Sequence, residues 1–283
     1  MRFGRQDYKG VNMSDCNHDC SSCGEKCEKA DFLAKPREDS KIKRIIAVVS
    51  GKGGVGKSMI TDLLTVETLR RGYKTAVLDA DITGPSVPKA FGLKDKALAT
   101  EDGKGIYPVE TAQGVKVMSM NLLLEGDGDP VVWRGPVISG AVQQFYTDVK
   151  WGDVDYMYVD MPPGTGDVPL TVFQSLPIDG IVVVTTPQDL VSMIVEKAVK
   201  MAGMMNVKIY GIVENMSFIE CPHCGEKIYP FGESKISEVA AKFSLPVLAT
   251  LPVDKNLSAL IDKGEVENAD TARIAGAVDV ITR

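Results

Sequence analysis

The chain has 283 residues, of which 44% are hydrophobic and 25% charged, and its formal net charge is −6. This composition is typical of a globular protein with one large α/β core. The negative charge gives no electrostatic reason to expect nucleic acid or an anionic membrane as the main partner. The longest apolar runs are as long as strands, and the N-terminus lacks the apolar stretch of a signal peptide. We therefore expect a cytoplasmic protein.

Residues 1–40 differ from the rest of the chain: they are polar, lack apolar periodicity and hold four of the six cysteines. We predict a flexible or metal-organised segment here, followed by one domain over residues 41–283. The four cysteines are Cys16, Cys20, Cys23 and Cys27. Four thiols at this spacing are enough to close a tetrahedral site, so we expect an iron–sulfur or zinc site. The alternative is a tail that handles clusters or metal only transiently.

From Lys41 onward, short apolar runs alternate with segments long enough for helices. The predicted strands are residues 44–50, 75–80, 115–120, 155–161, 180–186, 208–215 and 247–251. Continuous apolar strands are buried on both faces, which indicates a parallel sheet covered by helices on each side. The fold class is therefore α/β, with a doubly wound and mostly parallel sheet.

A phosphate-binding loop follows the first predicted strand. The sequence GKGGVGKS, residues 51–58, fits the pattern G-x4-G-K-[ST] and lies between a strand and a helical segment, where this motif must lie. Its backbone N–H groups converge on phosphate oxygens, Lys57 reaches the terminal phosphates, and the Ser58 hydroxyl can ligate Mg²⁺. The predicted nucleotide-binding residues of the loop are Gly51, Lys52, Gly53, Gly54, Val55, Gly56, Lys57, Ser58 and Met59.

Three aspartates follow predicted strands. Asp79 and Asp81 lie at the end of the second strand, and Asp160 lies at the end of another. In open α/β sheets ligands bind at the carboxyl ends of the parallel strands, so we expect all three beside the phosphate loop. The segment MPPGTGD after Asp160 is predicted to be a switch loop that senses the γ-phosphate and hinges at Gly164 and Gly166.

A second cysteine motif lies near residues 214–232, where Cys221 and Cys224 form a C-x2-C pair. Two thiols are half of what zinc or an iron–sulfur cluster normally requires. The other half could come from the N-terminal cysteines or from a second copy of the chain, or the pair could be a redox disulfide or purely structural. The spacing alone leaves these alternatives open.

The loop contains a second lysine, Lys52, directly after its first glycine. It resembles the deviant Walker A loop of the superfamily that includes nitrogenase iron protein and the Min and Par positioning ATPases. In that superfamily the extra lysine reaches across a two-fold interface to the nucleotide of the partner. The resemblance implies a nucleotide-dependent homodimer in which Lys52 takes part in hydrolysis.

Longer strings narrow the resemblance. WGDVDYMYVDMPPGTGD (151–167), LDADITGPSVP (78–88), VVWRGP (131–136) and the cysteine pair after NMSF together resemble the Mrp/ApbC family of iron–sulfur cluster carrier ATPases. The resemblance extends from Ile42 to the C-terminus. It implies an ATPase that carries a cluster and transfers it to apoproteins, with the slow hydrolysis of a molecular switch.

The resemblance also implies roles for individual residues. Asp160 is expected to hold Mg²⁺ through its water shell, Asp81 to position the attacking water, and Asp79 to respond to the metal and the γ-phosphate. Asn215 and Asp254 are expected to border the adenine base. These residues, with Lys52 and Lys57 as catalytic lysines, form the expected ATP and Mg²⁺ site.

For the cysteine pair, the resemblance implies that Cys221 and Cys224 of two protomers together hold one [4Fe–4S] cluster. A zinc-stapled dimeric ATPase that acts as a chaperone or positioning switch is the alternative, because CPHCG also resembles a zinc knuckle. A membrane-targeting ATPase would need a basic amphipathic C-terminal helix. The last fifteen residues instead predict a packed terminal helix.

Overall fold

The computed structural model describes residues 33–82, 84–124, 135–164, 166–187 and 191–283. The N-terminal cysteines lie outside these residues, so the site expected there stays a prediction. Leu33–Arg283 form one compact unit. Residues 33–40 are held to the rest of this unit, because the Ala34 N–H donates to the Ser175 carbonyl at 2.7 Å and Arg37 pairs with Asp102 at 3.0 Å.

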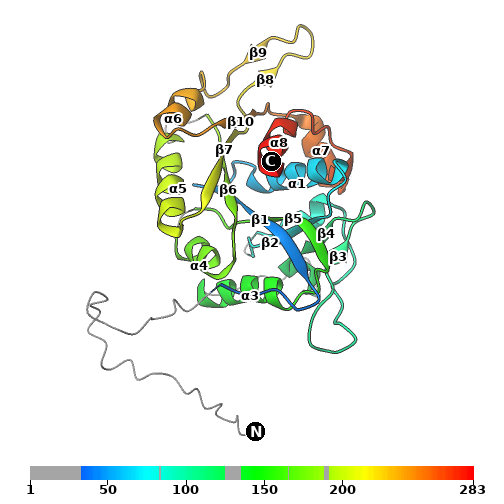
Figure 1. Ribbon diagram of the computed structural model, residues 1–283. Coiled ribbons are helices and arrows are strands. Elements are labelled where there is room, and N and C mark those ends of the chain that lie inside the picture. The colour runs from blue at the N-terminus through cyan, green and yellow to red at the C-terminus, as the bar shows by residue number, and fades with distance from the viewer. Residues whose placement is uncertain (1–32, 83, 125–134, 165, 188–190) are drawn as a thin grey trace, which may run out of the picture. The chain divides into compact units, whose positions relative to one another are not determined.

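The core of this unit is an eight-stranded sheet with the order β10-β7-β6-β1-β5-β2-β4-β3 (Figure 1). The strands are β1 (Lys41–Ser50), β2 (Thr75–Asp79), β3 (Val109–Glu110), β4 (Lys116–Met118), β5 (Asp153–Asp160), β6 (Gly180–Thr185), β7 (Lys208–Glu214) and β10 (Val247–Thr250). All neighbouring strands are parallel except β3, which pairs antiparallel with β4 at one edge. The mostly parallel sheet predicted from the apolar runs is thus confirmed.

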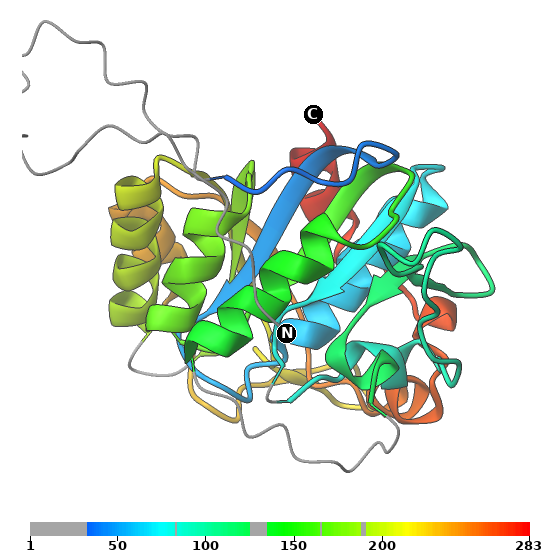
Figure 2. The ribbon, with the colours of Figure 1, turned by 90° about the horizontal axis from the view of Figure 1, so that it is seen from below.

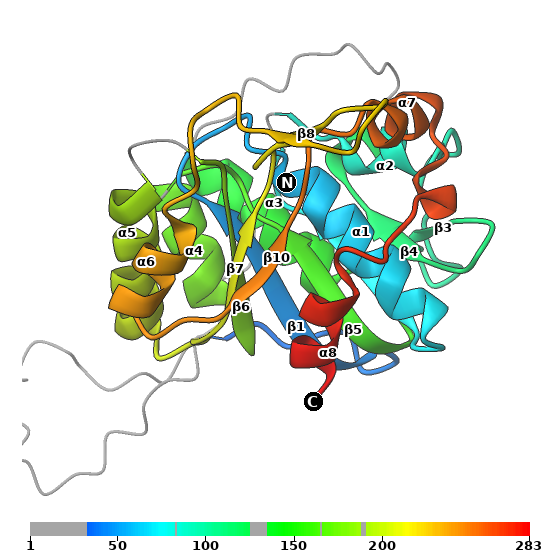
Figure 3. The same ribbon diagram turned by 90° about the horizontal axis from the view of Figure 1, so that it is seen from above.

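Helices cover both faces of the sheet. The α-helices are α1 (Lys57–Arg70), α2 (Val87–Ala90), α3 (Gly135–Thr147), α4 (Asp167–Ser175), α5 (Val191–Met205), α6 (Ile236–Lys242), α7 (Lys255–Lys263) and α8 (Ala275–Thr282), with short 3₁₀ turns η2 (Met120–Leu122) and η3 (Val266–Asn268). Helices α1, α7 and α8 pack on one face, and α3, α4, α5 and α6 pack on the other (Figures 2 and 3).

Strand β1 shows why the sheet is buried on both faces. Ile46 and Val48 point toward α1 and α8, whereas Ile45, Ala47 and Val49 point toward the opposite layer. All five side chains are nearly inaccessible to solvent. Side chains that alternate between two covered faces require an unbroken apolar run rather than an alternating pattern.

All seven predicted strands are present, and most differ from their predicted limits at only one end. The segment predicted over residues 115–120 is a strand only over Lys116–Met118, because the chain turns into η2 after Ser119. The sequence patterns did not predict β3 or the small hairpin of β8 (Ile219–Glu220) and β9 (Lys227–Ile228). Among the described residues no helix is long and apolar enough to span a membrane.

Candidate nucleotide and metal site

The carboxyl ends of three adjacent strands form the site. Strand β1 leads into the phosphate loop, and its neighbour β5 ends at Asp160. Strand β2 pairs with β5 so that Asp79 and Asp160 are in register. The predicted convergence of the loop and the strand-end aspartates is therefore what the parallel pairing produces.

The phosphate loop has the backbone shape that its glycines allow. Gly54 and Gly56 have φ angles of 79° and 80°, in the left-handed region that favours glycine. A Cβ on Gly56 would lie 2.3 Å from the Asn215 amide nitrogen. Gly56 also precedes α1, and no side chain caps that helix end. The first-turn N–H groups of α1 therefore suit an anion, and the helix dipole favours phosphate there.

Asp160 holds the loop lysine through a buried network. Its carboxylate is inaccessible to solvent, and Lys57 Nζ lies 2.5 Å from its Oδ1. Ser58 Oγ donates to Asp160 Oδ2 at 2.5 Å, and Thr61 Oγ1 lies 3.0 Å from Oδ1. The hydroxyl and carboxylate that would hold Mg²⁺ are therefore already in contact, which fits a hard cation with oxygen ligands.

Asp79 and Asp81 flank this network. Asp79 is buried, accepts a hydrogen bond from Ser119 Oγ at 3.0 Å, and accepts another from the Asp81 N–H at 3.2 Å. Burial, with the charge of Asp160, raises the pKa of Asp79 to about 8. Asp81 Oδ2 lies 3.9 Å from Lys57 Nζ, and the Asp81 side chain is 15% exposed. Asp81 therefore lies near the expected terminal phosphate with some access to water.

Asn215 and Asp254 were both expected beside the adenine. Asn215 is buried, and its Nδ2 donates to the Val55 carbonyl of the phosphate loop at 2.9 Å. Its Oδ1 is buried without a hydrogen-bond partner in the described structure, so it is free to accept from an amino group such as that of adenine. Asp254 caps α7 by accepting from the N–H groups of Asn256 and Leu257. Its contact with adenine remains a prediction.

Lys52 and Gly164, expected to act across a dimer and in the switch loop, both contact Ser50 at the end of β1. The Lys52 carbonyl accepts a hydrogen bond from Ser50 Oγ at 3.0 Å. The role of the Lys52 side chain across a dimer stays a prediction. Gly164 of the predicted switch loop has φ of 92°, and its N–H donates to the Ser50 carbonyl at 2.9 Å. Gly164 thus connects the segment after Asp160 to the end of β1.

Cys221 and Cys224 lie in the turn of the β8–β9 hairpin, beyond the sheet (Figure 1). Both are free thiols, Cys224 exposed and Cys221 partly so. Backbone N–H groups of His223 and Cys224, with the Cys224 side chain, lower the pKa of Cys221 and favour its thiolate. The residues that the structure describes contain no group of three or more metal-ligating side chains. The hairpin therefore offers two thiols, half of the number in a four-thiolate site.

The hairpin that carries this cysteine pair exposes apolar side chains, and two cations lie against the phenylalanine at its base. The exposed hydrophobic residues near it are Ile219, Ile228, Tyr229, Phe231 and Val253. Phe218 is buried at the base of the hairpin, with Lys227 Nζ 4.3 Å and the Arg273 guanidinium 5.8 Å from its ring centroid. Arg273 also pairs with Glu220 at 2.7 Å, which fixes the strand that leads to Cys221.

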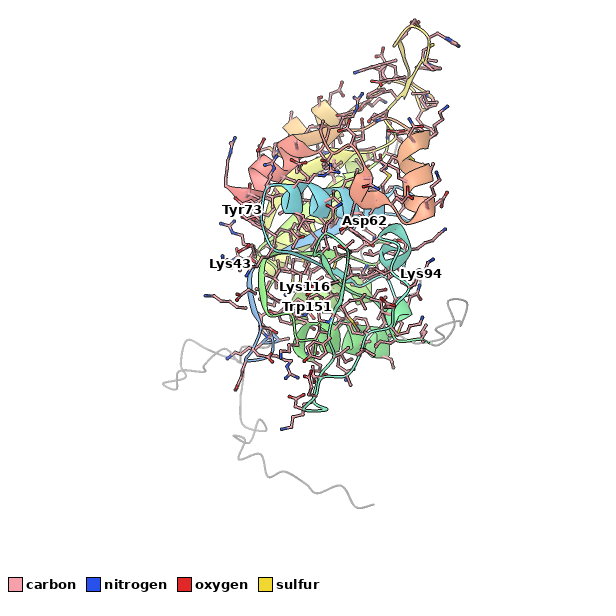
Figure 4. The ribbon with its side chains drawn as sticks, turned by 90° about the vertical axis from the view of Figure 1, so that its right-hand side faces the viewer. Lys43, Asp62, Tyr73, Lys94, Lys116 and Trp151 are labelled. Carbon is pink, nitrogen blue, oxygen red and sulfur yellow. The ribbon has the colours of Figure 1, made fainter. Side chains whose placement is uncertain are left out.

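The sequence analysis missed four polar residues of the site. Thr61 could have been found because it lies one helical turn after Lys57, and Ser119 because it lies near the end of the strand predicted over residues 115–120. Asp62 and Glu214 carried no signal, since a single acid in an apolar run gives no indication of its partners. Asp62, labelled in Figure 4, is a buried residue of α1. Burial and the charges of Asp160 and Asp79 raise the pKa of Asp62.

The fold and this site define a P-loop nucleotide-binding protein. The sequence model of the family described as the NUBPL iron-transfer P-loop NTPase matches residues 41–283. The chain belongs to that family. The matched residues include the whole sheet and the cysteine hairpin.

Curated relatives and solved structures agree with this assignment. A Clostridium perfringens protein named iron-sulfur cluster carrier protein is 48% identical, over 80% of this chain and 81% of its own. A Kluyveromyces lactis protein named cytosolic Fe-S cluster assembly factor CFD1 is 40% identical, over 83% and 85%. A nucleotide-binding protein from Archaeoglobus fulgidus in complex with ADP is 45% identical, with a TM-score of 0.73 over 81% of this chain and 89% of its own.

The fold is shared more widely. The cell division protein MinD of Aquifex aeolicus has a TM-score of 0.59 over 84% of this chain and 97% of its own, at 17% identity. At that identity the similarity concerns the fold alone.

Proposed function

We propose that the chain is an ATP-dependent iron–sulfur cluster carrier that holds a [4Fe–4S] cluster between two copies of itself and transfers it to apoproteins. The observation that carries the proposal is the two-thiol hairpin on a P-loop NTPase, because Cys221 and Cys224 make half of a four-thiolate site. The names of the curated relatives, which call those proteins cluster carriers or assembly factors, support it.

The nucleotide would bind as MgATP on the loop between β1 and α1. Backbone N–H groups and Lys57 would hold the phosphates, for which Lys57 must turn from Asp160 toward the phosphate oxygens. Ser58 and Asp160 would hold Mg²⁺, which supplies charge neutralisation at the phosphates. Asp81 would orient water, and Asp79 would respond to the metal through the shared strand ends.

Hydrolysis is proposed to be slow and to act as a switch. Gly164 contacts the end of β1, so a change at the γ-phosphate would reach the segment after Asp160. Lys52 would act on the nucleotide of the partner subunit, so turnover would require the homodimer. Cys16, Cys20, Cys23 and Cys27 are proposed to form a second iron–sulfur or zinc site. We propose a cytoplasmic location, since the Kluyveromyces relative is named a cytosolic assembly factor.

At the cargo site, the lowered pKa of Cys221 favours the thiolate that binds iron. The exposed apolar residues of the hairpin would exclude water from the cluster when two hairpins meet. Cluster transfer would then require the two copies of the hairpin to separate while ligands of the apoprotein replace the four thiolates on iron, because each copy holds two of the four thiolates.

Anaerobic reconstitution with iron and sulfide tests the proposal. The reference is the full chain with Cys16, Cys20, Cys23 and Cys27 changed to Ser, which isolates the hairpin. We expect four irons and four sulfides per dimer, a holo dimer on size exclusion, and transfer to an apoprotein. Cys221→Ala and Cys224→Ala should each abolish the cluster but retain nucleotide binding.

Three outcomes would contradict the proposal. The first is a holo monomer, and the second is a full cluster in either alanine variant. The third is tightly bound zinc without sulfide in protein purified anaerobically, which would support the zinc-stapled ATPase instead.

A further inference from the structure

Glu214, the last residue of β7, is a carboxylate buried in an unexpected place. It is inaccessible to solvent, and among the described residues no cation pairs with it. Burying an ionisable group is costly unless it is well hydrogen-bonded, and apolar residues occupy the preceding positions of the strand. Its presence there calls for a role beyond packing.

The carboxylate connects the two ends of the cysteine hairpin. Its Oε2 accepts a hydrogen bond of 2.6 Å from Ser217 Oγ, where the chain enters the hairpin. Its Oε1 accepts one of 2.6 Å from Ser234 Oγ, where the chain leaves it. Ser234 Oγ also accepts from the Ile236 N–H at the start of α6. A single side chain thus holds the entry and the exit of the segment that carries the two thiols.

The residue after Glu214 contacts the nucleotide site. Asn215 donates to the Val55 carbonyl of the phosphate loop, and a Cβ on Gly56 would collide with it. The next residue, Met216, has φ of 56°, a left-handed conformation that is uncommon outside glycine. Such a turn persists only when its surroundings hold it, and here buried hydrogen bonds on both sides do so.

We propose that Glu214 is a positioning residue that couples the phosphate loop to the cysteine hairpin. A displacement of Asn215 by the bound nucleotide moves the end of β7, and the carboxylate transmits that movement to both ends of the hairpin at once. The two ends of the hairpin therefore move together. The hairpin shifts relative to the sheet, and the exposure of its two thiols changes. The identity of the cargo rests on the proposed function, whereas the coupling between the phosphate loop and the hairpin does not.

The test reads the hairpin thiols without any cluster. The reference is the full chain with the four N-terminal cysteines changed to Ser, in which Cys221 and Cys224 are the only thiols. The rate of their reaction with a disulfide reagent is measured with and without saturating Mg²⁺ and a non-hydrolysable ATP analogue. We expect the nucleotide to change this rate by about fivefold or more.

Three variants and a control assign the effect to Glu214. Glu214→Ala should bind nucleotide but lose the rate change, to within about 1.5-fold of no effect. Glu214→Gln should retain it, since the amide keeps one acceptor and offers a donor to the second hydroxyl. Ser234→Ala removes only the exit contact and should reduce it, which keeps the test informative if Glu214→Ala does not fold. Glu233→Gln, which removes an exposed charge beside Ser234, should match the reference.

The proposal is overturned if the reference shows no nucleotide effect, or if Glu214→Ala or Ser234→Ala keeps the full effect. It is also overturned if Glu233→Gln loses as much as Glu214→Ala. Failure of cluster binding in the reconstitution described above, with the thiol effect intact, would instead reject the carrier function and leave the coupling in place.

Discussion

Lys57 and Asp160 form a buried ion pair in which Nζ lies 2.5 Å from Oδ1, with side chains 6% and 0% exposed. The pair links the phosphate loop to the end of β5, two segments that are far apart in the sequence. Each charge compensates the other in a site of low dielectric, so removing one leaves the other buried and unpaired. Binding of a phosphate must therefore offer Lys57 an equivalent anion, and a cation must then replace it at Asp160.

Lys57→Ala should abolish nucleotide binding and destabilise the fold. We expect affinity to fall about a hundredfold or more, since a charged hydrogen-bond donor to phosphate is lost. The free energy of unfolding should fall by about 3–5 kcal/mol, because Asp160 is left uncompensated. Titration calorimetry and urea denaturation measure the two effects. Adding Asp160→Asn should recover part of the stability without restoring binding, and an unchanged stability of Lys57→Ala would show that the pair is dispensable.

Lys52→Ala should spare nucleotide binding but abolish hydrolysis. The lysine is proposed to act on the nucleotide of the partner subunit, and a cation supplied in trans is worth about a thousandfold in rate. Phosphate release at a series of protein concentrations is the measurement. Wild-type turnover in this variant would reject a role for Lys52 across the dimer.

Asp81→Asn should bind MgATP normally and hydrolyse it more slowly by about two orders of magnitude. The amide keeps the size of the side chain, and the loop and its Lys57–Asp160 pair are unchanged, while the orientation of the attacking water is lost. Binding is followed by calorimetry and hydrolysis by phosphate release. The matched control is Asp95→Asn, an exposed acid away from the strand ends. If Asp81→Asn turns over like this control, Asp81 has been misassigned.

The buried acids predict a falling stability with rising pH in the presence of a chelator. Burial raises the pKa of Asp79 from 3.8 to about 8, and it raises that of Asp62 as well. The folded state therefore binds more protons than the unfolded state between about pH 4 and pH 8, so this contribution is full at acid pH and is lost as the pH rises.

Asp62→Asn isolates one of these acids, since Asp62 has an oxygen without a hydrogen-bond partner among the described residues. The neutral amide should stabilise the protein more at pH 8 than at pH 5.5, as measured by urea denaturation without Mg²⁺ or nucleotide. The same gain at both pH values would show that Asp62 keeps an ordinary pKa.

The sequence by itself determined the class of the fold and the chemistry of the loop. The motif of residues 51–58 is contiguous, so strand, glycine turn and helix start are encoded locally. The apolar runs predicted parallel strands for the same reason, since burial on both faces depends on each strand's own composition. The rule that ligands gather at carboxyl ends then placed Asp79 and Asp160 beside the loop before their partners were known.

Only the tertiary structure decided which distant groups meet. The order β6-β1-β5-β2 brings Asp160 to Lys57 and to the register of Asp79, and no local pattern contains that order. It also showed that Asp254 caps a helix, a contact that serves the helix whether or not adenine binds. The contacts of Glu214 could not be predicted from the apolar strand that contains it. Its hydroxyl partners, Ser217 and Ser234, lie on either side of a hairpin and meet only when the chain folds back. Local sequence determines conformation, whereas buried polar contacts depend on long-range packing.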